Sequence, residues 1–295
     1  MKLTFIFSEI YDFCKEIERY MVTESKIKDR GRKSMMHVSE VLTILTLFHT
    51  SGFKNFKVFY MQEVMVNLRS AFPRLPSYNR FIELKQKYVA YMTLLFSAKT
   101  TVARANYFDQ EQFADTFLIP VCDNKRIYSH KVFKGLAARG KGTMGWKYGW
   151  KLHVIISKTG EIISAFLTPA NIADNNAEIL FKLTRDIQGK IFADRGYLVN
   201  QEVFKTLLKN NVTLVTNVRT NMKKKPNHTE HEKKMLKKRG VVESVGNVLK
   251  NSLGLVHSRH RSLSGFIIHI FSCLMAYYFK PEKPSISPCF SLLNV

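Results

Sequence analysis

The stretch Lys190-Ile-Phe-Ala-Asp194-Arg-Gly-Tyr197 is a short apolar segment that ends in an aspartate followed by a glycine turn. A short apolar run that stops at a turn is typical of a sheet strand. Helical patterns flank it over residues 175–187 and 201–209, and a further strand-like run follows at 212–216. Alternating strands and helices predict a sheet covered by helices.

Three more strands are predicted upstream. Ala114–Cys122 alternates in side-chain character, and Lys151–Ser157 is separated from Glu161–Thr168 by Lys158-Thr-Gly160, which is a hairpin pattern. With a last helix over 239–250, the order is strand, hairpin of two strands, helix, strand, helix, strand, helix. This is the order of the ribonuclease-H-like fold, an α/β class with a mixed sheet and flanking helices. In that fold the first and fourth of these strands lie side by side.

The chain of 295 residues has 46 Lys and Arg against 23 Asp and Glu, a formal net charge of +23. This excess favours a polyanionic partner, with nucleic acid first and an anionic membrane surface second. The cysteines are scattered without a CxxC pair, so we expect reduced thiols in a cytoplasmic protein. The most apolar stretch, Leu263–Phe279, is short for a bilayer span and predicts a buried helix.

A second decisive stretch is Arg239-Gly-Val-Val-Glu243-Ser-Val-Gly-Asn-Val-Leu-Lys250. On a helix, Arg239, Glu243 and Lys250 share one charged stripe, which by itself is most simply a solvated face. The predicted fold brings Asp115 and Asp194 together, and Glu243 completes a cluster of three carboxylates. A single strand-end aspartate is usually a cap, but three acids at corresponding places of one fold predict a site.

Converging carboxylates repel one another unless a cation neutralises them. Hard divalent cations such as Mg²⁺ take oxygen ligands, and a pair of them can activate and stabilise the reacting oxygens of phosphoryl transfer. The cluster therefore implies a metal site. Asp123 and Asp174 are the reserve candidates if Asp115 is misassigned.

The lysines and arginines around these acids are candidate contacts for a phosphate backbone. Residues 135–142 read as a flexible basic loop, and residues 223–239 as a lysine-rich loop. Trp146 and Trp150 are interpreted first as packing residues, with base stacking as the alternative. The predicted DNA-binding residues are Arg80, Lys141, Lys223, Lys224, Lys225, Arg239 and Lys250.

Over nearly its whole length the chain resembles the DDE transposases of bacterial insertion sequences, in particular the insertion-sequence-982 group. The last matching stretch resembles the signature Tyr-x2-Arg-x3-Glu-x6-Lys, with Leu236 at the tyrosine place. The resemblance implies DNA strand cleavage and transfer by Asp115, Asp194 and Glu243 with two Mg²⁺ or Mn²⁺ ions. The matching stretches are Asp115–Cys122, Tyr148–His153, Leu167–Asp174, Asp194–Tyr197 and Arg239–Lys250.

Residues 1–105 show helical spacing throughout, and Ser77 is a predicted N-cap of a basic helix that carries Arg80. We expect an all-helical DNA-recognition domain over 1–105, a catalytic domain over 106–280 and a tail over 281–295. The expected partners are double-stranded DNA, as terminal inverted repeats and target, and a second copy in a homodimer, but no membrane. We expect a nucleoid-associated protein when DNA is bound. The charge alone also allows a non-catalytic nucleic-acid-binding protein.

Overall fold

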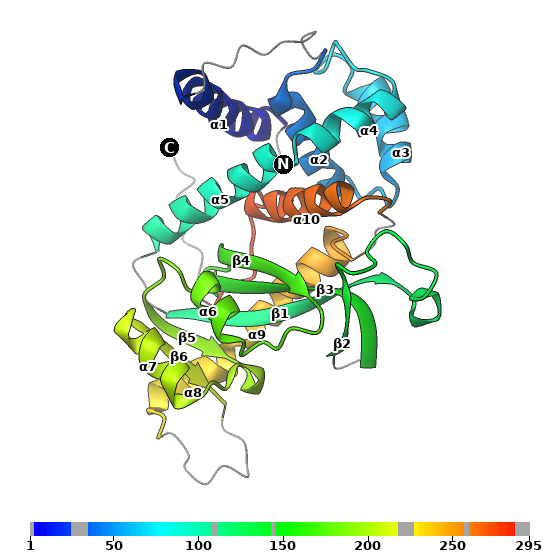
Figure 1. The fold of residues 1–295 in the computed structure, drawn as a ribbon. Helices are drawn as coiled ribbons and strands as arrows, with labels where there is room; N and C mark the ends of the chain where they lie inside the picture. Colours follow the sequence, from blue (N-terminus) through cyan, green and yellow to red (C-terminus); the bar gives the residue numbers. More distant parts are fainter. Residues whose placement is uncertain are drawn as a thin grey trace. The chain divides into compact units, whose positions relative to one another are not determined.

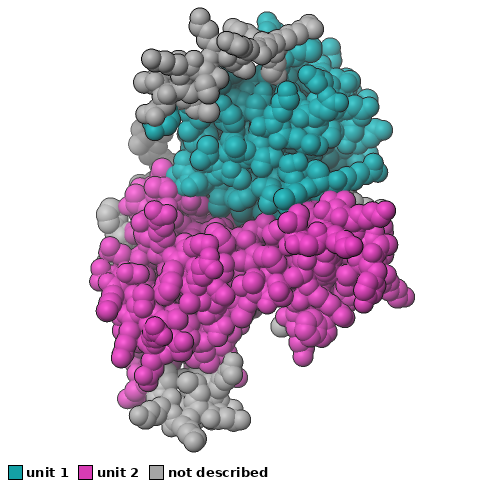
Figure 2. All heavy atoms as spheres, in the orientation of Figure 1, with its two compact units in different colours: residues 1–99, 249–281 teal, residues 100–248, 282–295 magenta. Residues whose placement is uncertain are grey.

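The computed structural model describes residues 3–24, 35–107, 111–142, 145–217, 227–256 and 260–286. The chain forms two compact units, coloured teal and magenta in Figure 2. The first comprises Met1–Lys99 and Leu249–Pro281, and the second comprises Thr100–Val248 and Glu282–Val295. Each unit is described by itself below.

The first unit is helical, which confirms the prediction of an all-helical N-terminal region. Ser77 caps its basic helix as expected, because its side chain accepts a hydrogen bond from the Arg80 backbone N–H at 3.5 Å. No described helix is both long enough and apolar enough to span a bilayer. The helices are α1 (Leu3–Glu24), α2 (Val38–Thr50), α3 (Phe56–Val58), η1 (Phe59–Asn67), α4 (Tyr78–Lys87), α5 (Val89–Asn106), η4 (Val248–Ser252) and α10 (Leu263–Tyr278).

Helix α10 is one of the two most buried helices of the first unit, together with α2. It packs against α2 and α4, and its apolar residues point to all sides, so it needs helices around it. Ten of its residues are buried, including Phe266, Ile270 and Leu274. This packing explains why 249–281 groups with the N-terminal helices, whereas the expected catalytic domain ran to residue 280.

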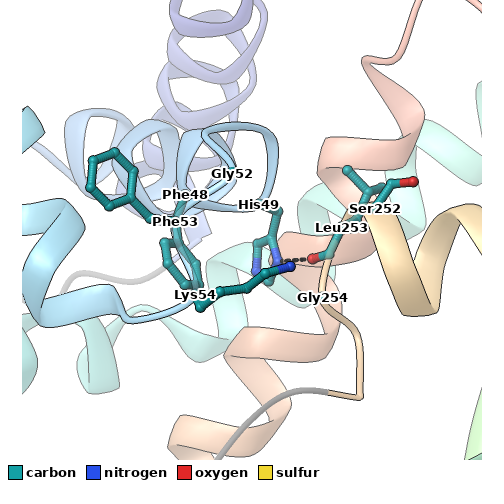
Figure 3. Close-up of a pocket in the computed structure, with 8 residues that line it drawn as sticks. All are labelled: Phe48, His49, Gly52, Phe53, Lys54, Ser252, Leu253 and Gly254. Carbon is teal, nitrogen blue, oxygen red and sulfur yellow. Dashed lines mark hydrogen bonds between the residues drawn. The ribbon is translucent and has the colours of Figure 1, made fainter.

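Three histidines meet at α10, of which His49 is buried and His260 and His269 are partly buried. The His269 ring lies 4.8 Å from the His49 ring and 4.7 Å from the His260 ring. His49 Nδ1 lies 2.7 Å from the Leu253 carbonyl oxygen, so it joins the end of α2 to the segment before α10 (Figure 3). Burial lowers the pKa of His49 to about 4, and burial with nearby Lys85 lowers the pKa of His260 to about 4.

The second unit is a six-stranded mixed sheet with helices on it (Figure 1). The strand order is β2-β3-β1-β5-β6, and β4 pairs with the same long β3. The strands are β1 (Glu111–Cys122), β2 (Ala138–Gly142), β3 (Gly145–Ser157), β4 (Ile162–Pro169), β5 (Gly189–Ala193) and β6 (Val212–Thr216). The helices are η2 (Asn124–Arg126), α6 (Ala177–Leu183), η3 (Arg195–Tyr197), α7 (Gln201–Lys209), α8 (Glu230–Lys238) and α9 (Gly240–Asn247).

The pairing confirms the ribonuclease-H-like order. Strand β1 pairs antiparallel with β3 and parallel with β5, so the first predicted strand and the strand before Asp194 are neighbours. The core between the sheet and α6 and α7 is apolar, with Ile155, Leu180 and Leu207 among its buried members. Asp115 therefore lies in β1, and Asp194 directly follows the adjacent strand β5.

Two predicted loops of this unit are wrong. Residues 138–142 form the edge strand β2, and residues 230–238 form α8, which begins with a capping box of Thr229 and Glu232. The sequence pattern did not predict β2 because glycine is unfavourable in strands. Gly140 is required there because a Cβ atom would lie 2.1 Å from the Ala170 carbonyl oxygen. Lys223, Lys224 and Lys225 lie outside the described residues.

The histidine cluster predicts a pH-dependent stability of the helical unit. A histidine whose folded pKa is lowered from 6.5 to about 4 stabilises the folded state fully above pH 6.5, and this contribution is lost as pH falls towards 4. His260→Leu should therefore make the decline between pH 6.5 and 4 shallower by about 1.4 kcal/mol per pH unit. Urea unfolding followed by circular dichroism measures this. The matched control is His231→Leu, an exposed histidine on α8, and an unchanged decline in His260→Leu would contradict the prediction.

Candidate active site

Asp115 lies in β1 with a largely buried side chain that is 20% exposed. Its Oδ1 accepts a hydrogen bond of 2.8 Å from the Thr116 backbone N–H. Burial raises its pKa to about 6, with Asp194 and Glu243 adding to the rise and the Thr116 N–H and Arg239 opposing it. A carboxyl group held in this environment favours a neutralising cation.

Asp194 directly follows β5 and caps η3, because its Oδ1 accepts a hydrogen bond of 2.9 Å from the Gly196 N–H. The β1–β5 register pairs Phe113 with Phe192. The β1–β5 ladder ends at this pair, so Asp194 lies just beyond the paired part of β5, near enough to Asp115 to contribute to the rise of its pKa. The two predicted aspartates therefore come together as expected.

Arg239 links the third acid to the first. Its Nη2 lies 3.0 Å from Glu243 Oε1, and its Nη1 lies 3.6 Å from Asp115 Oδ2. The Arg239 side chain is 16% exposed, so the interpretation of Arg239 as part of a solvated stripe is wrong. The reason is a break in the helix, since Arg239 stands between α8 and α9 and turns its guanidinium inward.

Glu243 itself is 64% exposed, on the outer side of α9. The opposite, valine-rich face of α9 packs on β1, where a Cβ atom at Gly246 would lie 2.4 Å from the Phe117 ring. The helix can seat its apolar face and still keep Glu243 near Asp115 because Arg239 spans the gap. This arrangement accounts for an acid that faces outward at the edge of the cluster.

A buried polar network, not foreseen from the sequence, lies beneath the aspartates. The Tyr197 hydroxyl and Thr116 Oγ1 are 2.8 Å apart, and Thr116 Oγ1 lies 3.1 Å from His153 Nδ1. His153 Nε2 lies 2.9 Å from Thr168 Oγ1. The network ties the turn of Asp194 to β1, β3 and β4. Its only sequence signal was the position of Thr116 and Tyr197 within the two aspartate segments.

Asp174, a reserve acid, also reaches this region. Its Oδ1 accepts a hydrogen bond of 2.9 Å from Lys151 Nζ, which also donates to the Ile172 carbonyl at 2.8 Å. A Cβ atom at Gly196 would lie 3.0 Å from Asp194 Oδ1 and 3.2 Å from Asp174 Oδ2, so both carboxylates flank the same point. A side chain at residue 196 would crowd both, which explains the glycine there.

The donor set suits a hard divalent cation in its chemistry, since Asp115, Asp194 and Glu243 offer only oxygen ligands. Within the described residues, however, no three His, Cys, Asp or Glu side chains are arranged to hold a metal ion together. Arg239 occupies the position between two of the acids, and its Nη1 is buried without a hydrogen-bond partner among the described residues. The three acids therefore suit a divalent cation in the kind of donor atom, whereas their described arrangement does not bring all three around one point.

The remaining predicted DNA-binding residues are dispersed. Lys141 is exposed on β2 of the sheet unit. Arg80 is on α4 of the helical unit, where it pairs with Glu83 at 2.6 Å, and Lys250 is half-buried in η4. Lys223, Lys224 and Lys225 fall outside the described residues, so their position stays a prediction.

Comparison with known proteins supplies a family match. A family model described as "Transposase DDE domain" matches residues 106–263. Two solved structures are similar: the Mos1 transposase paired-end complex with left transposon end and the Mos1 Strand Transfer Complex, at 12% and 11% identity. Each covers 89% of this chain and 85% of the other, with a TM-score of 0.22. No curated protein sequence matches the chain.

The environment of Asp115 predicts a stability gain on its neutralisation. A carboxyl whose folded pKa is raised from 3.8 to about 6 destabilises the folded state above pH 6, and this cost disappears below pH 4. Asp115→Asn should therefore raise the free energy of unfolding at pH 7.5 by up to about 3 kcal/mol and leave it unchanged near pH 4. Denaturant unfolding at both pH values tests this, with exposed Asp123→Asn as control. A loss of stability at pH 7.5 would contradict the prediction.

The polar network predicts energetic coupling between the two aspartate segments. Tyr197→Phe and Thr116→Val each remove one side of the same buried contact, and each should cost about 1 kcal/mol or more. The double variant should lose about 1 kcal/mol less of the free energy of unfolding than the sum of the losses of the two single variants. Urea unfolding of the four proteins gives this coupling energy, and strictly additive losses would show that the hydroxyls do not act as a pair.

Proposed function

The chain belongs to the transposases with a DDE domain, enzymes of DNA strand cleavage and strand transfer, and from that premise we propose Asp115, Asp194 and Glu243 as its catalytic carboxylates. The observation that carries this proposal is their placement. In support, Asp115 lies in β1, Asp194 follows the neighbouring parallel strand β5, and the Arg239 guanidinium lies between Asp115 and Glu243. The finer assignment, to the insertion-sequence-982 group of bacteria, rests on the resemblance of the sequence stretches.

We propose Mg²⁺ or Mn²⁺ as the cofactor, in two ions, held by these three acids. When bound, such ions activate the attacking oxygen and stabilise the leaving oxygen of phosphoryl transfer. Asp115, Asp194 and Glu243 would hold the ions, and Arg239, which contacts both Asp115 and Glu243, would lie beside them as a positive charge for a DNA phosphate.

Substrate DNA is the second part of the proposal. The net charge of +23 supports a polyanionic partner, and Arg80, Lys141, Lys250 and the lysines at 223–225 are the proposed contacts along it. We assign recognition of the element ends to the helical region 1–105, because α4 presents a capped basic helix there. Two element ends have to be cut, so we propose a homodimer.

A basic protein that only binds nucleic acid is the alternative from another class. The burial of Asp115 argues against it, because a raised carboxyl pKa costs folding stability and serves no purpose in a phosphate-binding surface. Such a protein would bind DNA regardless of divalent ions and of the three acids. An assay of how cleavage depends on divalent ions and on the three acids therefore distinguishes the enzyme from the binding protein.

We predict that Asp115→Asn, Asp194→Asn and Glu243→Gln each reduce cleavage by about a hundredfold or more, while DNA binding stays within a few-fold of the parent. The reason is the several kcal/mol of charge stabilisation that a misassembled cofactor site loses. The assay follows strand cleavage of duplexes from the DNA that flanks the coding sequence, with and without Mg²⁺ or Mn²⁺.

Asp186→Asn is the matched control, since it makes the same chemical change as the aspartate variants at an exposed aspartate that follows α6. The control should cleave at the parental rate. Cleavage by any of the three acid variants at the parental rate, or cleavage that persists without divalent ions, would contradict the proposed site.

A further inference from the structure

Residues 123–147, which join β1 to the part of β3 that pairs with it, form a projecting segment that we call the basic arm. It contains η2, a series of turns, β2 and the beginning of β3. The structure describes it except for residues 143 and 144. In Figure 1 the arm extends beyond the β2–β3 side of the sheet, away from β5 and β6. It belongs to the same compact unit as the three acids.

The charged side chains of the basic arm are almost all positive. It carries seven cations and one acid, Asp123. In the part of the chain that the structure describes, none of the seven forms an ion pair, whereas Lys151, Lys158 and Lys190 of the same sheet each pair with a carboxylate. The seven are Lys125, Arg126, Lys131, Lys134, Arg139, Lys141 and Lys147.

The arm is a packed structure rather than an open loop. Phe133 is 1% exposed, and its carbonyl accepts a hydrogen bond of 3.0 Å from the Tyr148 hydroxyl. The Asn124 side chain donates a 2.7 Å hydrogen bond to the Trp146 carbonyl, which closes the base of the arm. The cations are thus displayed on a fixed frame, so less conformational entropy is lost when they bind a ligand.

Large apolar side chains lie among these cations without burial. Tyr128 is 100% exposed, and Trp146 is 49% exposed with the Arg139 guanidinium 5.5 Å from its ring centre. A solvated charged face gains nothing from an exposed tryptophan and tyrosine. Cations interleaved with aromatic rings are the composition of a surface that contacts a nucleic acid chain.

We propose that the basic arm binds the DNA phosphate backbone on one side of the cleavage site. Seven residues of β1 separate Asp115 from Cys122, the last strand residue before the arm, which corresponds to about 23 Å at roughly 3.3 Å per residue. A duplex along β1 covers this span in about seven base pairs at about 3.4 Å each. The position relative to the cleavage site rests on the proposed function, whereas DNA binding by the arm does not.

The test uses the full chain and a fluorescent 30-base-pair duplex as probe, at about 50 to 300 mM salt. Lys131→Ala/Lys134→Ala should weaken binding roughly tenfold at low salt and reduce the salt slope by about one to two units, since each phosphate contact contributes about 0.9. The matched control, Lys205→Ala/Lys209→Ala, removes two equally exposed lysines on α7, beside β6 at the opposite edge of the sheet. The charge-retaining Lys131→Arg/Lys134→Arg should bind as the parent does.

A salt slope of the arm variant equal to that of the α7 control would overturn the proposal, as would a failure of the arginine variant to restore binding. Ethylation interference on the cleaved duplex should place the lost contacts about seven base pairs from the cut, and contacts only at the cut would also overturn it. A parent protein that binds through the arm but never cleaves would refute the proposed function alone. A parent that cleaves normally while arm and control variants match would refute the arm alone.

Discussion

The burial of the Asp115 carboxyl is the constraint around which the site is arranged, and the Arg239 guanidinium is the charge that opposes its effect. Arg239 stands at the junction of α8 and α9, where it contacts Asp115 at 3.6 Å and Glu243, four residues further on, at 3.0 Å. Its opposition is partial, since burial still leaves the pKa of Asp115 at about 6. On the proposed function, a divalent cofactor held by Asp115, Asp194 and Glu243 would supply further positive charge at the same place.

Three consecutive residues of β1 connect the parts of the site. Asp115 contacts Arg239. Phe117 lies on the same side of the strand, and Gly246 of α9 packs against its ring. Thr116 points to the other side, where it contacts the hydroxyl of Tyr197 and the ring of His153. Any shift of β1 by one residue would exchange these two faces and separate all the partners at once. The register of one strand therefore fixes the carboxylates, the helix that brings Glu243 and the turn that carries Asp194.

Much of this could be predicted because the strands and helices of the sheet have clear periodicity, and because the order of elements places Asp115 beside Asp194. The edge strand β2 was missed because its glycines do not form a strand pattern. Gly140 is needed there because the Ala170 backbone lies close to it, which is a tertiary contact that the local sequence does not report. The inward turn of Arg239 was missed because helical periodicity assumes one unbroken helix across 239–250. The grouping of α10 with the N-terminal helices depends on contacts between residues some two hundred positions apart, such as His49 and Ser272, which no local pattern reports.

Iron-mediated self-cleavage tests directly whether Asp115, Asp194 and Glu243 bind a cation together. Fe²⁺ bound in place of Mg²⁺, with ascorbate and peroxide, generates radicals that cut the backbone close to the ion. We predict backbone cuts near Asp115, Asp194 and Glu243. Excess Mg²⁺ should suppress these cuts, and Asp115→Asn should weaken them. Cuts confined to other segments, or a pattern of cuts indifferent to Mg²⁺ and to Asp115→Asn, would contradict the claim that these three carboxylates form one cation-binding site.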